Sequence, residues 1–356
     1  MIKKYLFLYL FFIKQLFCLE HFFISQNQNY KFNLSFLDDI KLKYKKFENN
    51  LFFDRNFIVD IKKVKDFCKS LPEHSEFKVL TKDNQEINVS FFNRNSDKLI
   101  FIGPGFSNQK EKLIPFVAMF PDYDVVIINF RGHVLNRLGI NLQTSLGDKE
   151  EQDIIAVINY INTNFNKYES KIGIGICFGG YNMVKAQALA EKNNEQLFDA
   201  LIIDGCCLSI DQSIDVLCSD PGLIFNPQKG GSYFFTKLIV GSDLIKYLIK
   251  NLIEYLLGID IKSLDAAQWF SCIKKTPILF IHSRPDLVIS WDSFISIYNS
   301  CNSKNKAAWI TSNAHVINHL KSKEIYAYLV EQIINNRFLI DIIQEITHPE
   351  NTILSQ

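Results

Sequence analysis

The stretch Gly175-Ile176-Cys177-Phe178-Gly179-Gly180 decides the fold of this chain. It ends an apolar run, Lys171 to Ile176, that predicts a buried strand, and a helical pattern follows from Tyr181 to Lys192. The chain has only 15 glycines in 356 residues, about 4% where roughly 7% is average. A cluster of glycines in such a chain indicates a local geometric demand. Because glycine lets backbone segments approach closely, we expect a sharp strand-to-helix turn that exposes Cys177.

This turn would place the sulfur of Cys177 at the N-terminus of a helix. Exposed N–H groups and the helix dipole at that position favour a thiolate over a thiol. The same glycines are also compatible with the close packing of an inert thiol. The sequence around the turn therefore favours a reactive cysteine and leaves a structural one as the alternative.

The rest of the chain alternates short apolar runs with helical patterns, after a β-hairpin predicted at residues 76–81 and 86–92. The apolar runs are residues 98–102, 123–130, 171–176, 200–203, 277–281 and 307–311, and the helical patterns are residues 110–120, 149–165, 181–192, 291–298 and 317–335. This alternation predicts an α/β fold with a mostly parallel sheet covered on both faces. Ligands of such sheets bind at the carboxyl ends of the strands, so the residues just after each strand are the candidates for a site.

From about Glu76 to Asn335 the chain resembles the α/β-hydrolase superfamily. In that superfamily a nucleophile lies on a strained turn between a strand and a helix, with small residues two positions before and two positions after it. Gly175 and Gly179 fill these positions around Cys177, which replaces the usual serine. The resemblance implies a mostly parallel eight-stranded sheet with helices on both faces and a helical cap insertion.

The superfamily's order of nucleophile, acid and histidine along the chain implies the other two members of a catalytic triad. Asp286 lies in the loop after the strand 277–281, and His315 lies in the loop after the strand 307–311. Asp204, at the end of the strand 200–203, is an alternative acid because some members carry the acid there. His319 is expected to be an ordinary helix residue, since a zinc site built on His315 and His319 would need further ligands that the sequence does not offer.

The resemblance also implies an oxyanion hole, in which two backbone N–H groups stabilise the charge that develops on a carbonyl oxygen. Gly103-Pro104-Gly105-Phe106 follows the strand 98–102 at the position of the superfamily's oxyanion loop. The expected donors are the N–H groups of Phe106 and Phe178. Pro104 replaces a histidine that is common in this loop, so Gly105 is an alternative donor. His133, in the turn after the strand 123–130, lies outside the catalytic order and is expected to be structural.

These residues together imply acyl transfer. The thiolate of Cys177 would attack an ester, thioester or lactone, and water would release the acid from an acyl-enzyme. No metal and no organic cofactor is required. A Gly-x-Cys-x-Gly pattern also resembles dienelactone hydrolases, and Gly175 to Gly180 fits the longer Gly-x-Cys-x-Gly-Gly pattern of polyhydroxyalkanoate synthases. An acyltransferase is therefore an alternative to a hydrolase, and a non-catalytic scaffold is a second alternative.

Composition limits the partners of the chain. A formal net charge of +1 and 47% hydrophobic residues exclude an intrinsically disordered chain and a polyelectrolyte that binds nucleic acid.

The long connection at residues 205–272 contains apolar pairs repeated every four residues from Leu244 to Leu257, which predicts an amphipathic helix. This helix is expected to pack on its neighbours and, compatibly with that, to offer an apolar wall over the site, so the expected ligand is a small acyl substrate with apolar groups.

The two ends of the chain differ from its middle. Lys3 and Lys4 precede an apolar run from Tyr5 to Ile13, which resembles an export signal and is too short to span a bilayer. We expect residues 1–20 to be a signal peptide or an N-terminal anchor, 21–75 an extension, 76–336 the α/β-hydrolase domain, and 337–356 a tail. The protein would then be exported or attached to a membrane, and otherwise cytoplasmic. The oligomeric state stays open.

Overall fold

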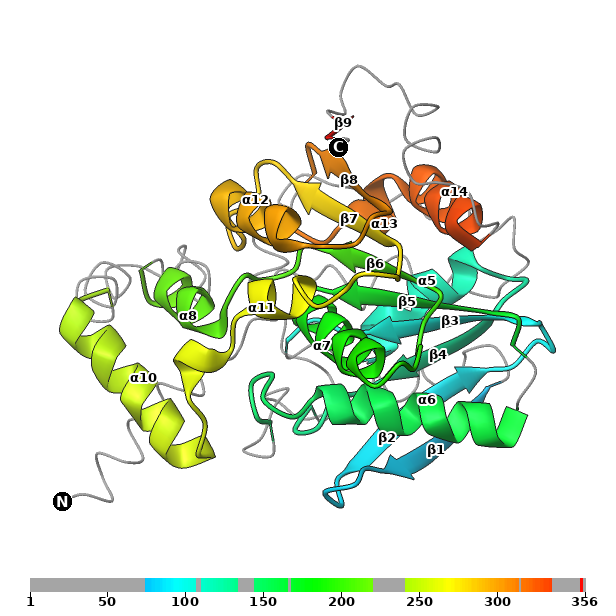
Figure 1. Cartoon of the computed structure of the whole chain (residues 1–356), viewed down its shortest axis with the longest axis horizontal. Coiled ribbons are helices and arrows are strands. Elements are labelled where there is room, and N and C mark those ends of the chain that lie inside the picture. Colours follow the sequence, from blue (N-terminus) through cyan, green and yellow to red (C-terminus); the bar gives the residue numbers. More distant parts are fainter. Residues whose placement is uncertain are drawn as a thin grey trace, which may run out of the picture.

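The computed structural model describes residues 74–106, 110–133, 144–165, 168–219, 241–313, 315–334 and 353–354. Within these residues one sheet runs in the order β1-β2-β4-β3-β5-β6-β7-β8-β9 (Figure 1). Strands β3 to β8 are parallel, and β1, β2 and β9 pair antiparallel with their neighbours. The bounds are β1 Ser75–Leu80, β2 Glu86–Phe92, β3 Lys98–Gly103, β4 Asp124–Ile128, β5 Ser170–Ile176, β6 Ala200–Asp204, β7 Ile278–Ser283, β8 Lys306–Thr311 and β9 Ile353–Leu354.

The predicted α/β fold with its mostly parallel sheet is confirmed, and so is the hairpin formed by β1 and β2. The sheet has nine strands among the described residues where eight were expected. The additional strand, β9, has two residues, pairs with the edge strand β8 and belongs to the predicted tail. Two residues are too few for an alternating pattern, so β9 could not be predicted from the sequence.

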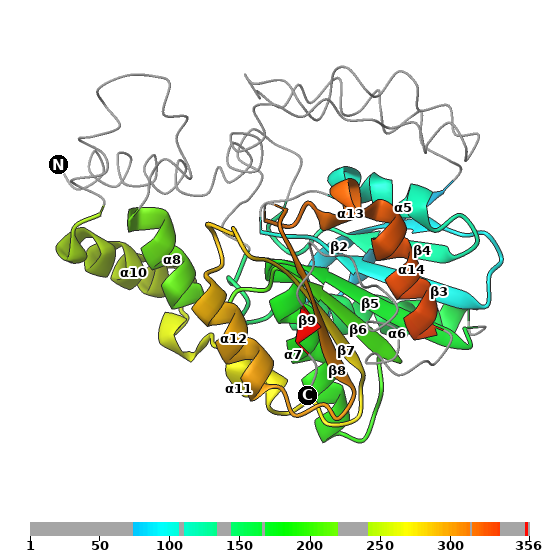
Figure 2. The same ribbon diagram turned by 90° about the horizontal axis from the view of Figure 1, so that it is seen from above.

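Helices cover both faces of the sheet (Figures 1 and 2). Because successive side chains of a strand point to opposite faces, β3 buries Leu99 and Phe101 in one core and Ile100 and Ile102 in the other. The first core is completed by α6, α7, α11 and α12, and the second by α5 and α14. The bounds are α5 Ile114–Met119, α6 Glu151–Phe165, α7 Phe178–Lys192, α11 Ala266–Phe270, α12 Trp291–Ser300, α13 Asn318–Lys321 and α14 Lys323–Ile334.

The connection between β6 and β7 contains further helices, α8 (Ile210–Ser219) and α10 (Asp243–Leu257), and the two lie side by side (Figures 1 and 2). The predicted amphipathic helix is α10. Ile249 and Ile253 are buried, and Lys250 forms ion pairs of 2.7 and 2.8 Å with Asp211 and Asp215 of α8. Tyr255, which is 84% exposed, lies on a face of α10 that points to solvent. The helix therefore packs on its neighbour in the insertion, as the first of the two expectations had it.

The predicted N-terminal segment 1–20, most of the extension 21–75 and most of the tail 337–356 lie outside the described residues. Their predicted roles therefore stay predictions. In the part of the chain that the structure describes, none of the helices combines the length and the apolar character that a membrane span needs.

A buried ion pair connects the turn after β4 to α6. The guanidinium of Arg131 donates to Oδ1 of Asp153 at 2.7 Å, and a further bond of 2.6 Å joins it to Asp83 in the turn between β1 and β2. The side chain of Asp153 is fully buried. Burial disfavours the charge of Arg131, but the hydrogen bonds to Asp83 and Asp153 raise its pKa above the ordinary value. Arg131 thus holds three segments of the domain together.

Replacing Arg131 by methionine is expected to lower the free energy of unfolding by about 3–5 kcal/mol, because the carboxyl group of Asp153 would stay buried without its ion-pair partner. Lys78→Met is the control, since the Lys78–Glu86 pair lies exposed on the surface and such pairs contribute about 0–1 kcal/mol. Urea unfolding at neutral pH measures both variants. Equal losses for the two variants would contradict the role given to Arg131.

Candidate active site

Cys177 lies at a strained turn between β5 and α7. It is the N-cap residue of α7, with φ +50° and ψ −111°, a backbone conformation that side chains other than glycine rarely adopt. Its N–H donates to the carbonyl oxygen of Asp204 on β6 at 2.8 Å, and its own carbonyl accepts from the N–H of Gly180 at 3.0 Å. The predicted sharp turn with Cys177 at the N-terminus of a helix is confirmed.

The glycines around Cys177 are required by close backbone contacts. A Cβ atom on Gly179 would lie 2.1 Å from the carbonyl oxygen of Gly103, at the end of β3. A Cβ atom on Gly175 would lie 2.5 Å from the Cα atom of Gly180. Backbone atoms cannot move aside as the end of a flexible side chain can. The glycines therefore let the start of α7 lie directly on the ends of β3 and β5.

Gly179→Ala is expected to destabilise the fold by about 3 kcal/mol, because the added methyl group collides with backbone. Gly258→Ala is the matched control. Gly258 has φ +65° at the C-cap of α10, but nothing lies within 4 Å of an added Cβ atom, so only the cost of the left-handed conformation remains. That cost is about 1 kcal/mol. Denaturant unfolding compares the two variants, and a Gly179→Ala protein as stable as Gly258→Ala would contradict the packing argument.

The structure brings Asp286 and His315 together. Nδ1 of His315 and Oδ2 of Asp286 are 2.5 Å apart, and both side chains are buried. The other carboxylate oxygen of Asp286, Oδ1, accepts from the N–H groups of Val288 at 2.8 Å and Ile289 at 2.9 Å. These bonds fix the carboxylate, which in turn fixes the orientation of the imidazole.

The charges of these groups depend on one another. Burial lowers the pKa of His315, but the charges of Asp286 and Cys177 and hydrogen bonds with both raise it well above the usual range. Burial raises the pKa of Asp286, but the charge of His315 and the hydrogen bond to it lower this pKa below the ordinary value. His315 is therefore bonded to Asp286, and the charge of Cys177 contributes to its raised pKa.

Asp204, the alternative acid, does not hold His315. Its Oδ1 atom accepts instead from Nδ2 of Asn318 at 3.1 Å, and its side chain is almost completely buried. Asp286 is the carboxylate bonded to the imidazole.

The loop after β3 lies next to the start of α7, as the prediction of an oxyanion hole requires. The ring of Phe106 contacts the ring of Phe178 edge to face, with centroids 5.3 Å apart. His133 is buried beside both of these rings, 5.6 Å from Phe106 and 6.0 Å from Phe178. This aromatic environment agrees with the structural role expected for His133. His319, expected to be a helix residue, stacks on Phe116 at 4.3 Å, and burial lowers its pKa to about 3.

Asn318 also belongs to this site, although no pattern in the sequence assigns it a role. Its Oδ1 atom accepts from Oγ1 of Thr311 at 2.7 Å and from Nδ2 of Asn313 at 3.1 Å, while its Nδ2 atom donates to Asp204. An asparagine shortly after a histidine is too common to be a signal. Only the folded chain shows that Asn318 connects the ends of β6 and β8.

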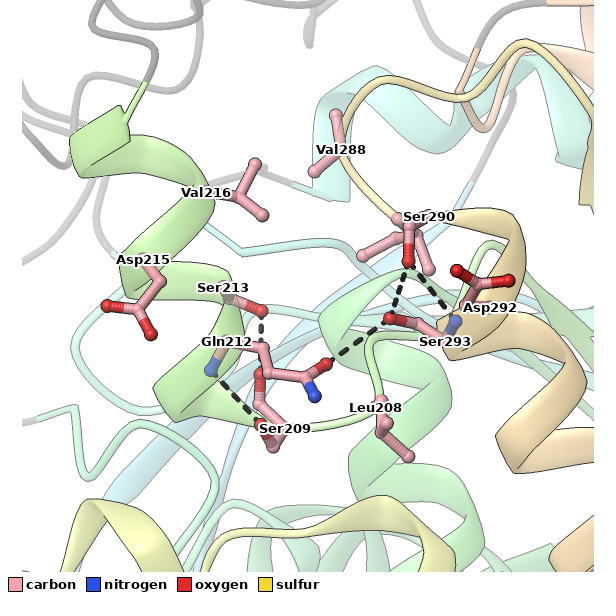
Figure 3. Close-up of a pocket in the computed structure, with 11 residues that line it drawn as sticks. Leu208, Ser209, Gln212, Ser213, Asp215, Val216, Val288, Ser290, Asp292 and Ser293 are labelled. Atoms are coloured by element: carbon pink, nitrogen blue, oxygen red, sulfur yellow. Dashed lines mark hydrogen bonds between the residues drawn. The ribbon is translucent and has the colours of Figure 1, made fainter. Parts of the chain in front are cut away.

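A cleft of about 340 Å³ lies between α8 and the start of α12 (Figure 3). Oγ of Ser293 on α12 donates to Oε1 of Gln212 on α8 at 3.2 Å and so links the two helices. Val288 and Ile289 also line this cleft, and their N–H groups hold Asp286. The cleft therefore borders the loop that carries the acid of the site.

No protein-family model and no curated protein matches the chain. Solved structures do match it. The esterase Pf2001 of Pyrococcus furiosus is 17% identical, with a TM-score of 0.56 over 75% of this chain and 93% of that one. The esterase EaEST of Exiguobacterium antarcticum is 13% identical, with a TM-score of 0.52 over 73% and 100% of the two chains. An acylaminoacyl peptidase of Pyrococcus horikoshii is 19% identical, with a TM-score of 0.51 over 76% and 43%. The chain has the α/β-hydrolase fold.

Proposed function

We propose that this protein hydrolyses an ester, thioester or lactone through an acyl-enzyme formed on Cys177. The observation that carries the proposal is the buried pair of Asp286 and His315 near the partly exposed Cys177, which lies on a strained turn at the N-terminus of α7. Perturbed titratable groups gathered at the carboxyl ends of parallel strands are typical of catalytic sites. The esterases among the similar structures agree with this chemistry.

In the proposed mechanism His315 takes the proton of the Cys177 thiol through Nε2, because Nδ1 is bonded to Asp286. The sulfur attacks the carbonyl carbon, and the electron pair of the C=O bond moves to the oxygen. The N–H groups of Phe106 and Phe178 are the proposed donors to this oxyanion. As the tetrahedral intermediate collapses, the bond to the leaving group breaks and the imidazolium of His315 gives its proton to that group.

Water completes the cycle. His315 takes a proton from the water as it attacks the thioester carbonyl, and the second tetrahedral intermediate releases the acid and the thiolate, which recovers a proton from His315. Asp286 keeps the imidazole in the tautomer with a proton on Nδ1 and stabilises the imidazolium. None of these steps requires a metal or an organic cofactor. The cleft between α8 and α12 offers room for part of a substrate beside the acid loop.

Product analysis and mass spectrometry of the Cys177 peptide test the proposal. Wild-type protein is mixed with p-nitrophenyl esters of several chain lengths and with acyl-CoA, and the products and the mass of the Cys177 peptide are measured. An acyl adduct on Cys177 together with free acid is the expected result. An adduct whose acyl group passes to another acceptor in place of water would indicate the alternative, an acyltransferase. No adduct and no turnover with any of these substrates would leave the non-catalytic scaffold.

A further inference from the structure

Asp204 is a buried carboxyl group that the proposed mechanism does not use. It ends β6, the strand next to β5, and its carbonyl oxygen accepts the N–H of Cys177 at 2.8 Å. The side chain is 1% exposed. Its Oδ2 atom has no hydrogen-bond partner among the described residues. A buried carboxyl group is costly unless other groups pair with it. We therefore expect Asp204 to have a specific structural or functional role.

The partner of Asp204 is Asn318, which begins α13 directly after the loop that carries His315. Nδ2 of Asn318 donates to Oδ1 of Asp204 at 3.1 Å. Oδ1 of Asn318 accepts from Thr311, the last residue of β8, at 2.7 Å. His315 lies between Thr311 and Asn318 in the chain. The bonds of the Asn318 amide therefore join the two ends of this loop. The bond to Asp204 connects the loop to the end of β6, next to Cys177.

We propose that Asp204 is a positioning residue, which acts through the amide of Asn318 to hold the His315 loop at Cys177. The inference rests on the proposed function. Val316, next to His315, has φ +47°, an unfavourable conformation for a β-branched residue. Such a conformation persists only where surrounding contacts impose it. The bonds of Asn318 supply these contacts, and without them the imidazole would lose its fixed distance from the sulfur.

The charge of Asp204 adds a second effect. Burial raises the pKa of Asp204 to about 7, against the lowering effects of the Asn318 hydrogen bond and the charge of His315. Asp286 faces it from the loop after β7, and the charge of Asp204 contributes to the raised pKa of Tyr326 on α14. Near neutral pH the carboxyl group thus gains or loses a proton. Its charged form favours the imidazolium form of His315.

Two substitutions separate the two effects. Asp204→Ala removes the nearer acceptor of Asn318 Nδ2, at 3.1 Å, and leaves Oγ of Ser283 at 3.4 Å. It is expected to lower kcat by roughly 10- to 100-fold with little change in KM, because a misplaced catalytic group costs about this much. Asp204→Asn keeps an oxygen at the Oδ1 position but carries no charge. It is expected to retain most of kcat, and to shift the alkaline limb of the pH profile to lower pH, because the imidazolium loses a nearby negative charge.

The test measures the alkylation of Cys177 by iodoacetamide against pH, by mass spectrometry of the Cys177 peptide, together with ester turnover. Alkylation reports on the Cys177–His315 pair even if the protein turns over no ester, so the inference and the proposed function can fail separately. Because Asp204 acts through Asn318, Asp204→Ala combined with Asn318→Ala is expected to be no slower than the slower single variant.

Gln187→Ala is the matched control. Gln187 is another fully buried amide with two hydrogen bonds, to Thr276 and Phe198, but it lies at the opposite ends of β6 and β7. Its loss is expected to lower stability without moving the alkylation profile. Additive effects of Asp204→Ala and Asn318→Ala, or a wild-type pH profile in Asp204→Asn, would overturn the inference. If Asp204→Ala does not fold, Asp204→Asn and Asn318→Ala still decide it.

Discussion

Replacing Cys177 by alanine is expected to lower kcat for p-nitrophenyl esters at least about 10⁴-fold and to abolish the acyl adduct. The methyl group of alanine cannot form the covalent intermediate, and no other nucleophile lies at the tip of this turn. The substitution is also expected to leave the fold intact, because alanine tolerates the N-cap backbone no worse than cysteine does. Steady-state kinetics, with mass spectrometry of the protein after incubation with ester, measures both effects.

The control for Cys177→Ala is Cys272→Ala. Cys272 is also a partly exposed free cysteine, and its Sγ atom contacts the carbonyl oxygen of Gln268 at 3.2 Å, near the end of α11. Its removal is expected to leave kcat within about twofold of wild type, since surface changes away from special features have small effects. If Cys177→Ala kept its activity, or if the adduct formed on Cys272, the assignment of the nucleophile would be wrong.

Asp286→Asn is expected to lower kcat by about 10³- to 10⁴-fold, the second largest effect. The side-chain amide can still accept the N–H groups of Val288 and Ile289, so the loop keeps its shape. An NH₂ group would then face Nδ1 of His315, which has to become the acceptor, and the proton would move to Nε2. Nε2 could no longer accept the proton of Cys177. The imidazolium form would also lose the charge that stabilises it.

The pH dependence follows from the same contact. The pKa of His315 is raised in the folded chain, mainly by the charge of Asp286 against the effect of burial. In Asp286→Asn this pKa is expected to fall, so the alkaline limb of kcat/KM shifts to lower pH. Asp199→Asn is the control, because Asp199 holds the N–H of Lys171 at the opposite ends of the strands. An unchanged alkaline limb in Asp286→Asn would contradict the role of Asp286.

The dependence of stability on pH follows from the raised pKa of His315 and the lowered pKa of Asp286. A histidine whose pKa rises on folding stabilises the fold below its unfolded pKa, and this contribution is lost as pH rises through the folded pKa. An aspartate whose pKa falls on folding stabilises above its unfolded pKa, and that contribution is lost as pH falls through the folded pKa. The bond between Asp286 and His315 therefore contributes most to stability between the unfolded pKa of Asp286 and the unfolded pKa of His315.

The sequence determined the features that depend on neighbouring residues. Cys177, Gly175 and Gly179 lie within five positions, so the demand for small residues around a strained turn can be recognised without knowledge of the rest of the fold. The sheet was equally predictable, because alternation of apolar runs and helical patterns is a local property. The predicted order of nucleophile, acid and histidine also named Asp286 and His315, and the two side chains are in contact in the folded chain.

Only the tertiary structure decided which distant groups share a bond. Strands β5, β6, β7 and β8 are neighbours in the sheet, so residues from four separate parts of the chain meet at the carboxyl ends of these strands. The sequence left both Asp204 and Asp286 as acids, and the folded chain assigns Asp286 to His315 and Asp204 to Asn318. It also revealed Asn318 itself. The physical reason is that a hydrogen bond depends on the register and order of strands far apart in sequence, whereas a tight turn depends on the residues that form it.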